Sequence, residues 1–297
     1  MSEPFRQFKM IINPISGAGR GLKEGRHLAR LLLQEGIAVE TFITRQPQDA
    51  EKEARQSQIP LIVVGGDGTV NEVINGLAGR DIPLAVFPVG TANILAREFH
   101  LPRNPAAFLS MIRSARVRLL DAGQICGQMV NRRFLMVASL GLDAEVTRIM
   151  LQSRSGPIHL SSYLIPLWNA LKHYHYSPFT LRIDDRVITP PATTAVIGNI
   201  RNYGGFFSIT HRARPDDGWL DICVFSGNSR RDYLRYLLGA LWRRPSIFSD
   251  VVYCRGKKID LIKASRPIPV ELDGDFFGYT PLTCTIIPHS IPLFLPA

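Results

Sequence analysis

The sequence predicts an α/β protein of two domains: a doubly wound, mostly parallel sheet first, then an antiparallel β-sandwich-like domain. Over about the first 125 residues, apolar strand patterns alternate with amphipathic helix patterns, as in βαβ units. Beyond that point, short β-runs separated by turn residues dominate, which is typical of antiparallel sheets. A length of 297 residues also favours two domains. We expect domains at residues 1–125 and 126–297, with the extreme carboxyl terminus a candidate to return to the first.

In the first domain the strands and helices follow one another in strict alternation. The expected strands are Phe8–Asn13, Ile37–Ile43, Ile59–Val64, Ile82–Phe87 and Val117–Ile125. The expected helices are Leu22–Gln34, Gln46–Gln56, Gly68–Leu77, Thr91–Phe99 and Asn104–Ser114. Ligands bind at the carboxyl ends of the strands in such sheets. Because Asn13, Gly65 and Gly90 each follow a strand, we expect them to converge.

In the second domain the β-runs are short, and two helical insertions interrupt them. The expected strands are Phe134–Ser139, Phe179–Ile183, Thr193–Ile200, Leu220–Phe225, Lys258–Ile262, Ile268–Leu272 and Leu282–Ile287. The insertions are about Leu160–Tyr174 and Asp232–Trp242. Together the two domains predict a site in a cleft between them.

The chain carries a net charge of +10, with 35 basic against 25 acidic residues. Such a surface attracts anions: nucleic acid, an acidic membrane or a polyphosphate ligand. No helix-turn-helix, zinc-finger or RNA-binding signature is present, so nucleic acid is not an expected partner. Apolar runs fall short of the roughly 20 residues of a membrane span, and no secretory signal precedes the first strand. A cytosolic protein is expected; charge for solubility alone is the alternative.

The most informative stretch is a glycine loop between a buried strand and a helix. It reads Gly65-Gly66-Asp67-Gly68-Thr69, with Asn71 and Glu72 in the helix that follows. The first backbone N–H groups of a helix attract a phosphate, and glycine lets the anion approach. Asp67 puts a carboxylate where a magnesium ion would sit. A tight strand–helix turn without a ligand is the alternative.

Two further loops follow strands in the same way. The first contains Asn13, Pro14, Ser16, Gly17 and Arg20, but lacks both the dinucleotide and the P-loop spacing. It either contacts a nucleotide phosphate or only connects two elements. The other contains Gly90, Thr91 and Asn93. Thr91 either caps a helix or reaches a phosphate or ribose, and Asn93 is a candidate to orient Asp67.

The second domain contributes two acidic turns. Asp216-Asp217-Gly218-Trp219-Leu220-Asp221 is either a hairpin turn or an oxygen-rich loop for a divalent cation. Glu271-Leu272-Asp273-Gly274-Asp275 places three carboxylates at the end of a β-run. Surface turns have this composition, but acids that face a phosphate site supply a general base or magnesium ligands.

Together these residues resemble the diacylglycerol kinase catalytic-domain family, which includes sphingosine kinases and bacterial soluble lipid kinases. The resemblance covers nearly the whole chain. It matches Asn13-Pro14 with Ser16-Gly17, Thr44 ahead of Asp49-Ala50, Gly65–Thr69 with Asn71-Glu72, Gly90–Asn93, Asp121, and Gly198-Asn199 with Tyr203-Gly204-Gly205. Two departures stand out: Ile94 follows Asn93 where the family often has aspartate, and the family's Asp-Gly-Glu is Asp273-Gly274-Asp275.

The resemblance implies roles for these residues. The three loops, with Thr44, Asn71, Glu72 and Arg20, would bind ATP. Asp67 and Asp121 would be linked to the catalytic Mg²⁺. Asp217, with the backbone of Arg214 and Trp219, would hold a structural Mg²⁺. Asp275 or Asp273 would be the base, and position favours Asp275.

The implied activity is an ATP- and Mg²⁺-dependent lipid kinase of phospholipid metabolism. It would transfer the γ-phosphate to a hydroxyl of diacylglycerol or a related lipid alcohol. The sequence does not identify the lipid. An NAD kinase or phosphofructokinase-like enzyme is the enzymatic alternative, since both use Gly-Gly-Asp-Gly loops. A non-catalytic, nucleotide-dependent membrane-binding module is the other.

A basic amphipathic segment suggests how the chain reaches a lipid. Between Arg230 and Arg244, the apolar residues 233, 234, 237, 238, 241 and 242 form one helical stripe. Such a helix lies at an anionic membrane surface, or else packs on the protein's own sheet. Peripheral association of a cytoplasmic protein with an anionic membrane is therefore an expectation. The oligomeric state is open, with a homodimer among the expectations.

Overall fold

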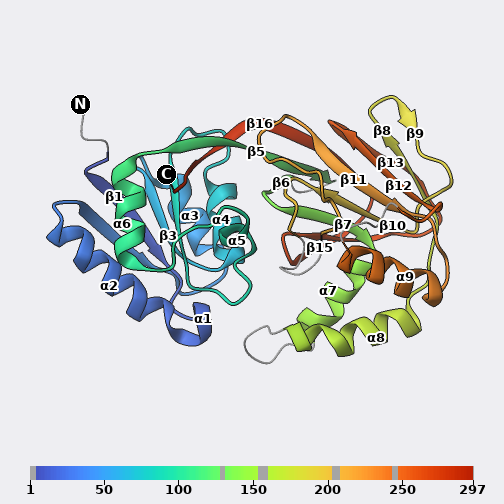
Figure 1. Ribbon diagram of the computed structural model, residues 1–297, viewed down its shortest axis with the longest axis horizontal. Helices are drawn as coiled ribbons and strands as arrows, with labels where there is room; N and C mark the ends of the chain where they lie inside the picture. The colour runs from blue at the N-terminus through green and yellow to red at the C-terminus, as the bar shows by residue number, and fades with distance from the viewer. Residues whose placement is uncertain (1–4, 128–130, 153–159, 203–207, 243–246, 297) are drawn as a thin grey trace. The chain divides into compact units, whose positions relative to one another are not determined.

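The computed structural model describes residues 5–127, 131–152, 160–202, 208–242 and 247–296 (Figure 1). The chain divides into two compact units, Met1–Leu120 with His289–Ala297, and Asp121–Pro288. Two long strands, β5 (Val117–Gly127) and β16 (Leu282–Phe294), carry the chain from one unit to the other. None of the described helices has the length and apolar character needed to cross a membrane.

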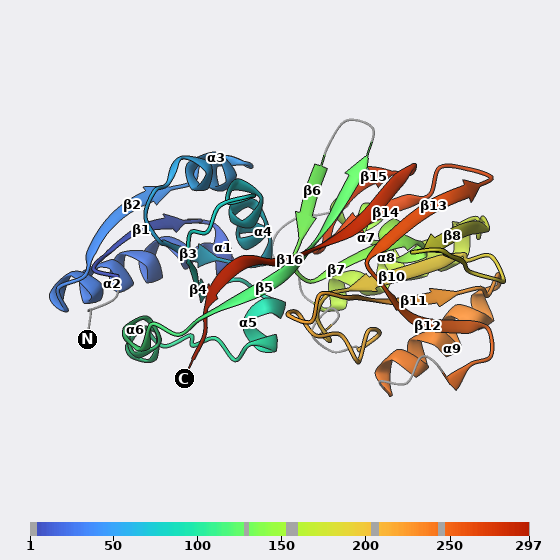
Figure 2. The same ribbon diagram turned by 90° about the horizontal axis from the view of Figure 1, so that it is seen from above.

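The first unit is built on parallel strands in the order β2-β1-β3-β4, with the end of β16 beside β4. Its strands are β1 (Gln7–Ile12), β2 (Ala38–Ile43), β3 (Leu61–Gly65) and β4 (Leu84–Pro88). Its helices are α1 (Ser16–Gly19), α2 (Gly21–Gln34), α3 (Asp49–Gln56), α4 (Asp67–Gly76), α5 (Ile94–Glu98) and α6 (Pro105–Ser114). Figure 2 shows α2 and α6 on one face of this sheet and α3 and α4 on the other, as in a doubly wound fold.

Burial on both faces explains the composition of the central strands. Every residue of β3 and β4 is buried, and the two strands pair in parallel register from Leu61–Leu84 to Gly65–Pro88. Continuous apolar runs are what a parallel sheet covered by helices requires. Each fully buried aliphatic side chain contributes about 1.5–3 kcal/mol.

The strand order creates one switch point, between β1 and β3. The chain leaves β1 for α2 on one face, and leaves β3 for α4 on the opposite face. At such a point the two loops diverge at the carboxyl ends of adjacent strands, where ligands bind in open α/β sheets. Both loops here belong to the glycine-rich segments singled out in the sequence.

The second unit contains two antiparallel layers. A six-stranded sheet has the order β12-β11-β10-β7-β14-β15; the other layer contains β16, β13, β8 and β9, with β6 paired to β5. These strands are β6 (Asn131–Phe134), β7 (Val137–Gly141), β8 (Phe179–Ile183), β9 (Arg186–Val187), β10 (Thr194–Gly198), β11 (Leu220–Phe225), β12 (Val251–Gly256), β13 (Lys258–Ala264), β14 (Pro269–Leu272) and β15 (Asp275–Tyr279). Both layers contribute to one apolar core, which includes Phe134, Leu181, Ile222 and Val270.

Helices gather on the outer side of the six-stranded sheet (Figure 1). They are α7 (Leu142–Gln152), the 3-10 helix η1 (Leu160–Tyr163), α8 (Leu164–His173) and α9 (Arg230–Leu241). α7 contacts β7, β14 and β15, and the ring of Tyr236 in α9 packs on Phe225 of β11 with 4.8 Å between centroids.

The predicted fold class is confirmed, but several elements differ from expectation. The strand predicted at Phe134–Ser139 is two strands, β6 and β7, separated at Leu135 and Met136. The helix α7 and the strands β9, β12 and β15 were not predicted. The helix predicted at Gln46–Gln56 begins only at Asp49, because the Asp49 carboxylate accepts hydrogen bonds from the backbone of Arg45 and Gln46 and holds a turn there.

One ion pair, between buried Asp260 and exposed Arg182, helps to link three strands of the second unit. Asp260 in β13 accepts hydrogen bonds from Arg182 of β8 at 2.9 Å and from Thr283 of β16 at 2.8 Å. Burial alone would raise the pKa of this carboxyl. The hydrogen bonds from Arg182 and Thr283 and the charge of Lys258 outweigh it and hold the pKa below its ordinary value.

We therefore expect Asp260→Asn to lower the free energy of unfolding by about 1–3 kcal/mol at pH 7. Because the folded-state pKa is lowered, this contribution is complete above the unfolded pKa of about 3.9 and is lost as the pH falls through the folded value. Urea unfolding at pH 7 and in strong acid measures it. Asp185→Asn, in an exposed turn, is the control. A difference that stays constant with pH would contradict the linkage.

Candidate active site

The three glycine loops of the first unit meet at the carboxyl ends of β1, β3 and β4. Asn13 of the first loop donates from Nδ2 to Thr69 Oγ1 of the second at 2.9 Å. A Cβ added to Gly90 would lie 2.6 Å from the Cα of Gly66, and one added to Gly17 would lie 2.1 Å from the carbonyl oxygen of Val89. Only glycine permits such approaches. The predicted convergence of the three loops is confirmed.

The first loop turns sharply before α2. Gly17 and Ala18 both adopt left-handed backbone angles, with φ of 61° and 58°. The turn leaves Arg20 exposed, with its Nε donating to the carbonyl oxygen of Gly17 at 2.9 Å. Pro14 and Ser16 are half-buried beside it. This loop therefore places a guanidinium group at the rim of the three-loop cluster.

The second loop opens directly into α4. Val70 donates to the carbonyl oxygen of Gly66, so the N–H groups of residues 67 to 69 precede the first intrahelical bond. Gly68 is exposed and Gly66 half-buried, with no side chain on either. The start of α4 thus offers backbone donors and the positive end of a helix dipole, which suit an anion.

The carboxylate of Asp67 reaches from α4 to the third loop. Its Oδ2 accepts from the backbone N–H of Ile94 at 3.0 Å, and its Oδ1 from that of Leu95 at 3.2 Å. Asp67, a residue of α4, therefore caps the N-terminus of α5. Burial raises the pKa of the Asp67 carboxyl, while these hydrogen bonds and the charge of Arg97 act in the opposite direction.

The expectations for the third loop need correction. Thr91 is exposed and does not cap a helix, because α5 begins only at Ile94 and takes its cap from Asp67. Asn93 is buried with φ of 45°, and its Nδ2 donates to the carbonyl oxygen of Gly90 at 2.6 Å. The two backbone N–H groups that follow it, rather than its side chain, hold Asp67.

Other motif residues of the first unit have structural contacts. Thr44 is buried and donates to the carbonyl oxygen of Ile12 at 3.4 Å. Glu72 accepts from the backbone N–H of Ala50 at 3.2 Å and so links α4 to the first turn of α3. Asn71 is buried and accepts from Asn75. These contacts fix the helices behind the loops.

Asp121 belongs to the second unit, where it holds the acidic turn. Its Oδ2 accepts from the backbone N–H of Gly218 at 2.7 Å, and its own N–H donates to Pro215. Asn199 is fully buried and donates to the carbonyl oxygens of Asp121 and Leu135. Tyr203, Gly204 and Gly205, the rest of that motif, lie outside the described residues.

Asp217 in this turn is engaged by the chain's own cation. It accepts from the N–H of Trp219 at 3.2 Å and pairs with Arg255 at 3.0 Å. Arg255 also bridges to buried Asp221, the last residue of the acidic stretch that the sequence predicted as a turn or a cation loop. Burial raises the pKa of Asp221, while Tyr253 and Arg255 oppose the shift. Arg255 lies directly opposite Asp221 on the neighbouring strand β12, but the two residues are 34 positions apart, so the sequence carried no local signal of their pairing.

Asp273 and Asp275 differ in their contacts. Asp273 is buried with φ of 50°, and its carboxylate accepts from three successive backbone N–H groups, of Leu135, Met136 and Val137, at 2.8–2.9 Å. Asp275 begins β15 and is exposed. The contacts of Asp273 are those of a structural clamp between β6 and β7.

Glu271 is the third carboxylate of the acidic stretch that ends at Asp275. It is buried, accepts from Ser139 Oγ at 2.7 Å, and accepts from the N–H of Gly274 in the turn that carries Asp275. Burial, reinforced by the charge of Asp143, raises the pKa of the Glu271 carboxyl well above its ordinary value. Its position four residues before Asp275 was the available signal.

The residues present fit the expected catalytic Mg²⁺ site at Asp67 better than the expected structural Mg²⁺ site at Asp217. Across the described ranges, no group of three or more His, Cys, Asp or Glu side chains could hold a metal ion. A Mg²⁺ ion that is bound by one carboxylate and by substrate phosphates needs no such group. Asp67, at the start of α4, fits this kind of site. At the acidic turn, Arg255 already neutralises Asp217.

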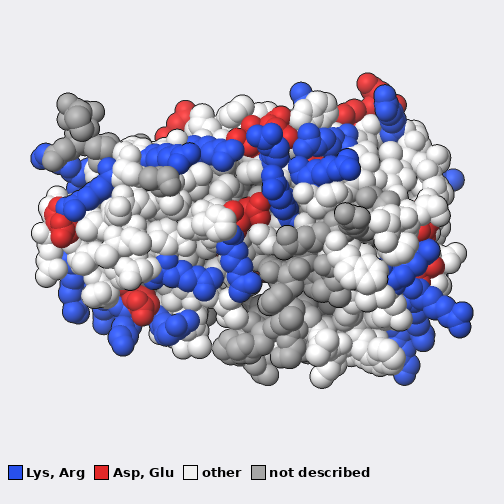
Figure 3. Space-filling view, in the orientation of Figure 1, with Lys and Arg blue, Asp and Glu red and all other residues white. Residues whose placement is uncertain are grey.

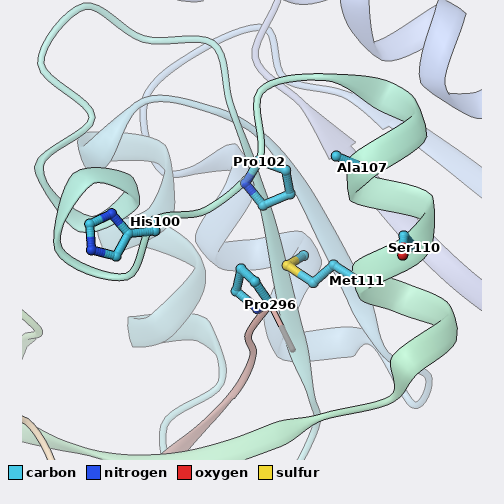
Figure 4. Close-up of a pocket in the computed structure, with 6 residues that line it drawn as sticks. All are labelled: His100, Pro102, Ala107, Ser110, Met111 and Pro296. Carbon is cyan, nitrogen blue, oxygen red and sulfur yellow. The ribbon is translucent and has the colours of Figure 1, made fainter.

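A separate pocket of about 270 Å³ lies in the first unit. Figure 4 shows its lining: His100, Pro102, Ala107, Ser110, Met111 and Pro296. None of the three glycine loops contributes to it, and the lining contains neither carboxylates nor Lys or Arg. It is not a site for a polyphosphate.

Comparisons with known proteins agree with this architecture. The model of the diacylglycerol kinase catalytic domain matches residues 7–125, and that of the YegS C-terminal NAD kinase beta sandwich-like domain matches residues 136–295. A diacylglycerol kinase of Mycobacterium tuberculosis (strain CDC 1551 / Oshkosh) is 30% identical over 293 residues, which cover 96% of this chain and 94% of the relative. A diacylglycerol kinase of Staphylococcus aureus (strain MRSA252) is 26% identical, with 98% of this chain and 93% of the relative covered.

The fold has close counterparts among solved structures. A crystal structure of a diacylglycerol kinase from Bacillus anthracis str. Sterne has a TM-score of 0.78 at 24% identity, with 98% of each chain covered. The parallel unit with its glycine loops and the antiparallel unit define the class of this protein, a kinase of two domains. The chain belongs to the diacylglycerol kinase catalytic-domain family.

Asp273 and Asp275 give a direct test of the structural clamp. Asp273→Ala leaves three backbone N–H groups without their acceptor, at about 1–3 kcal/mol for each buried donor. We expect the free energy of unfolding to fall by at least about 3 kcal/mol, and Asp275→Ala to change it by less than about 1 kcal/mol. Urea unfolding compares the two variants. Equal losses would show that the clamp does not depend on the Asp273 carboxylate.

Proposed function

We propose that this protein is a lipid kinase that transfers the γ-phosphate of ATP, in a Mg²⁺-dependent reaction, to a hydroxyl of diacylglycerol or a related lipid alcohol. Family membership and relatives named diacylglycerol kinase support it. The observation that carries the proposal is the convergence of the three loops around the start of α4.

The loops offer what a triphosphate needs. The N–H groups at the start of α4 donate to phosphate oxygens, and exposed Gly68 has no side chain to obstruct the approach. Arg20 adds a positive charge at the rim. Phosphoryl transfer depends mainly on positioning and neutralising charge, so a rigid cluster of backbone donors suits this chemistry.

Asp67 is the residue that would hold Mg²⁺ in the first unit. The ion would neutralise the charge of the phosphates that the loops bind. Each carboxylate oxygen accepts one N–H bond and keeps a second lone pair. The roles of Asp121 in the catalytic magnesium site, and of Asp217 with the backbone of Arg214 and Trp219 in a structural one, stay predictions.

Asp275 is the proposed base. Its exposure leaves the carboxylate accessible to an acceptor hydroxyl, whereas Asp273 is occupied by three backbone donors. The hydroxyl proton passes to the Asp275 carboxylate as the hydroxyl oxygen bonds to the γ-phosphorus. The bond from that phosphorus to the bridging oxygen breaks, and ADP leaves with the electron pair.

A kinase assay tests the reaction and its base together. We expect the wild type to transfer labelled phosphate from ATP to diacylglycerol in mixed micelles, and Asp275→Asn to lower the rate by about 10²–10⁴-fold, the usual contribution of a general base. Asp81→Asn, an exposed aspartate of the first unit, is the matched control. Transfer to NAD and not to any lipid would favour the small-molecule kinase. ATP binding without transfer would favour the non-catalytic module.

The close approach of the second and third loops gives a second test. In Gly90→Ala the new Cβ would lie 2.6 Å from the Cα of Gly66 and 2.8 Å from Asn93 Oδ1, so the loops must separate. We expect the affinity for a non-hydrolysable ATP analogue to fall at least about tenfold, or 1.4 kcal/mol. Calorimetric titration measures the affinity.

The matched control is Gly79→Ala. It strains a backbone with φ of +77° but meets no atom within 4 Å and lies outside the loops. It should leave the affinity unchanged. Normal ATP-analogue binding by a folded Gly90→Ala variant would remove the three loops from the nucleotide site.

A further inference from the structure

The outer faces of α8 and α9 carry large apolar side chains that the second unit does not bury. They are Leu164, Ile165 and Trp168 on α8, Leu234 and Leu238 on α9, and Trp242 directly after it, with exposed fractions between 50% and 73%. We call these six residues the α8–α9 face. Contiguous exposed apolar side chains, unlike single ones, mark an interaction surface.

These side chains lie on the solvent side of helices that are firmly anchored on the other side. Leu234, Leu238 and Trp242 are spaced by four residues and share one face of α9. The opposite face is buried: Tyr233 Oη lies 2.8 Å from the hydroxyls of Thr193 and Thr194, and Tyr236 accepts from the N–H of Gly227.

The stripe expected between Arg230 and Arg244 is therefore divided. Tyr233 packs on the protein's own sheet, while Leu234 and Leu238 face solvent. Arg243 and Arg244 lie outside the described residues. Packing on the protein's own sheet is therefore confirmed for one side of the helix, and contact of the uncovered side with a membrane stays a prediction.

The two helices form one surface rather than two. The C-terminal end of α8 meets the start of α9, where Arg230 Nη2 donates to the carbonyl oxygen of Lys172 at 2.8 Å. The rings of Tyr176 and Tyr233 stack behind this junction with 4.9 Å between centroids. Figure 1 shows α8 and α9 on the same side of the second unit.

The exposed charged residues of α8 and α9 are basic. Lys172, Arg230 and Arg231 are exposed, and no ion pair between described residues contains them. α8 has no acidic residue, and the one in α9, Asp232, caps the helix and pairs with Arg235. Figure 3 shows a largely uncharged surface over these helices, with Lys and Arg at its border.

We propose that the α8–α9 face docks on an anionic lipid bilayer, with Leu, Ile and Trp side chains in the interface and the basic residues against acidic head groups. Apolar side chains, tryptophans and basic residues on one helical face suit the boundary between head groups and acyl chains. This inference rests on the proposed function, because a lipid acceptor resides in a bilayer. A second copy of the chain fits less well, since a twofold contact would bring the same cations together.

Vesicle flotation tests the docking without catalysis. The wild type should bind phosphatidylcholine vesicles that contain phosphatidylglycerol, bind pure phosphatidylcholine much more weakly, and show a blue shift of tryptophan fluorescence on binding. Lys172→Gln with Arg231→Gln should weaken binding about 25-fold, from about fivefold for each charge removed.

The apolar part is tested by one pair of substitutions on each helix. Ile165→Ser with Trp168→Ser, and Leu234→Ser with Leu238→Ser, should each weaken binding at least about tenfold. Leu33→Ser, an exposed leucine of α2 in the first unit, is the matched control and should bind as the wild type does. All these side chains are exposed, so circular dichroism should show unchanged folding.

The outcomes separate docking from kinase activity. The variants should keep full transfer to a short-chain diacylglycerol in solution and lose it on diacylglycerol within vesicles. Vesicle binding that the substitutions leave unchanged, equal binding to neutral and anionic vesicles, or loss on one helix only would overturn the proposal. So would a dimer that the same substitutions dissociate. Vesicle binding without transfer to any lipid would overturn the proposed function and leave the docking surface standing.

Discussion

The candidate site depends on the carboxylate of Asp67 reaching across from one strand–helix turn to the next. By accepting the N–H groups of Ile94 and Leu95, it fixes where α5 begins and holds the third loop against the second. The bond from Asn13 to Thr69 then attaches the first loop. Glycines at the contact points allow the three backbones to approach, so hydrogen bonds and missing side chains act together. The N–H groups of residues 67 to 69 precede the first intrahelical bond of α4, so the assembled loops still offer backbone donors to an anion.

The same chemistry recurs in the second unit. Asp273 joins β6 to β7 through three backbone donors, and Asp121 holds the turn at Gly218. Most acids in the family motifs for which the structure gives hydrogen bonds therefore organise backbone. The motif residues thus fall into two groups: residues that hold loops and turns in place, and exposed residues such as Asp275.

Features of the fold and the site that depend on residues close together in the sequence could be predicted, and those that depend on distant residues could not. The strands β3 and β4 were evident because a sheet covered on both faces selects continuous apolar runs. The convergence of the loops followed from the parallel order. The cap of α5 by Asp67 could not be predicted, because the two residues lie 27 positions apart and no periodicity connects them. The break between β6 and β7 could not be predicted for the same reason, because Asp273, which holds it, lies in a turn 138 residues further along the chain. The α8–α9 face needed the structure to show which side of each helix is covered.

The return of β16 to the first unit has a consequence for biosynthesis. Leu293 pairs with Leu84 of β4, Leu295 donates to Arg116, and Phe294 packs against Phe5 and Phe8. The N-terminal sheet therefore lacks its border strand until translation has passed Phe294, when the whole intervening unit has already been made. Until then β4 presents an unpaired edge, which is a hazard for aggregation. A nascent chain of this protein must either keep its first unit open or shield that edge while the second unit emerges from the ribosome.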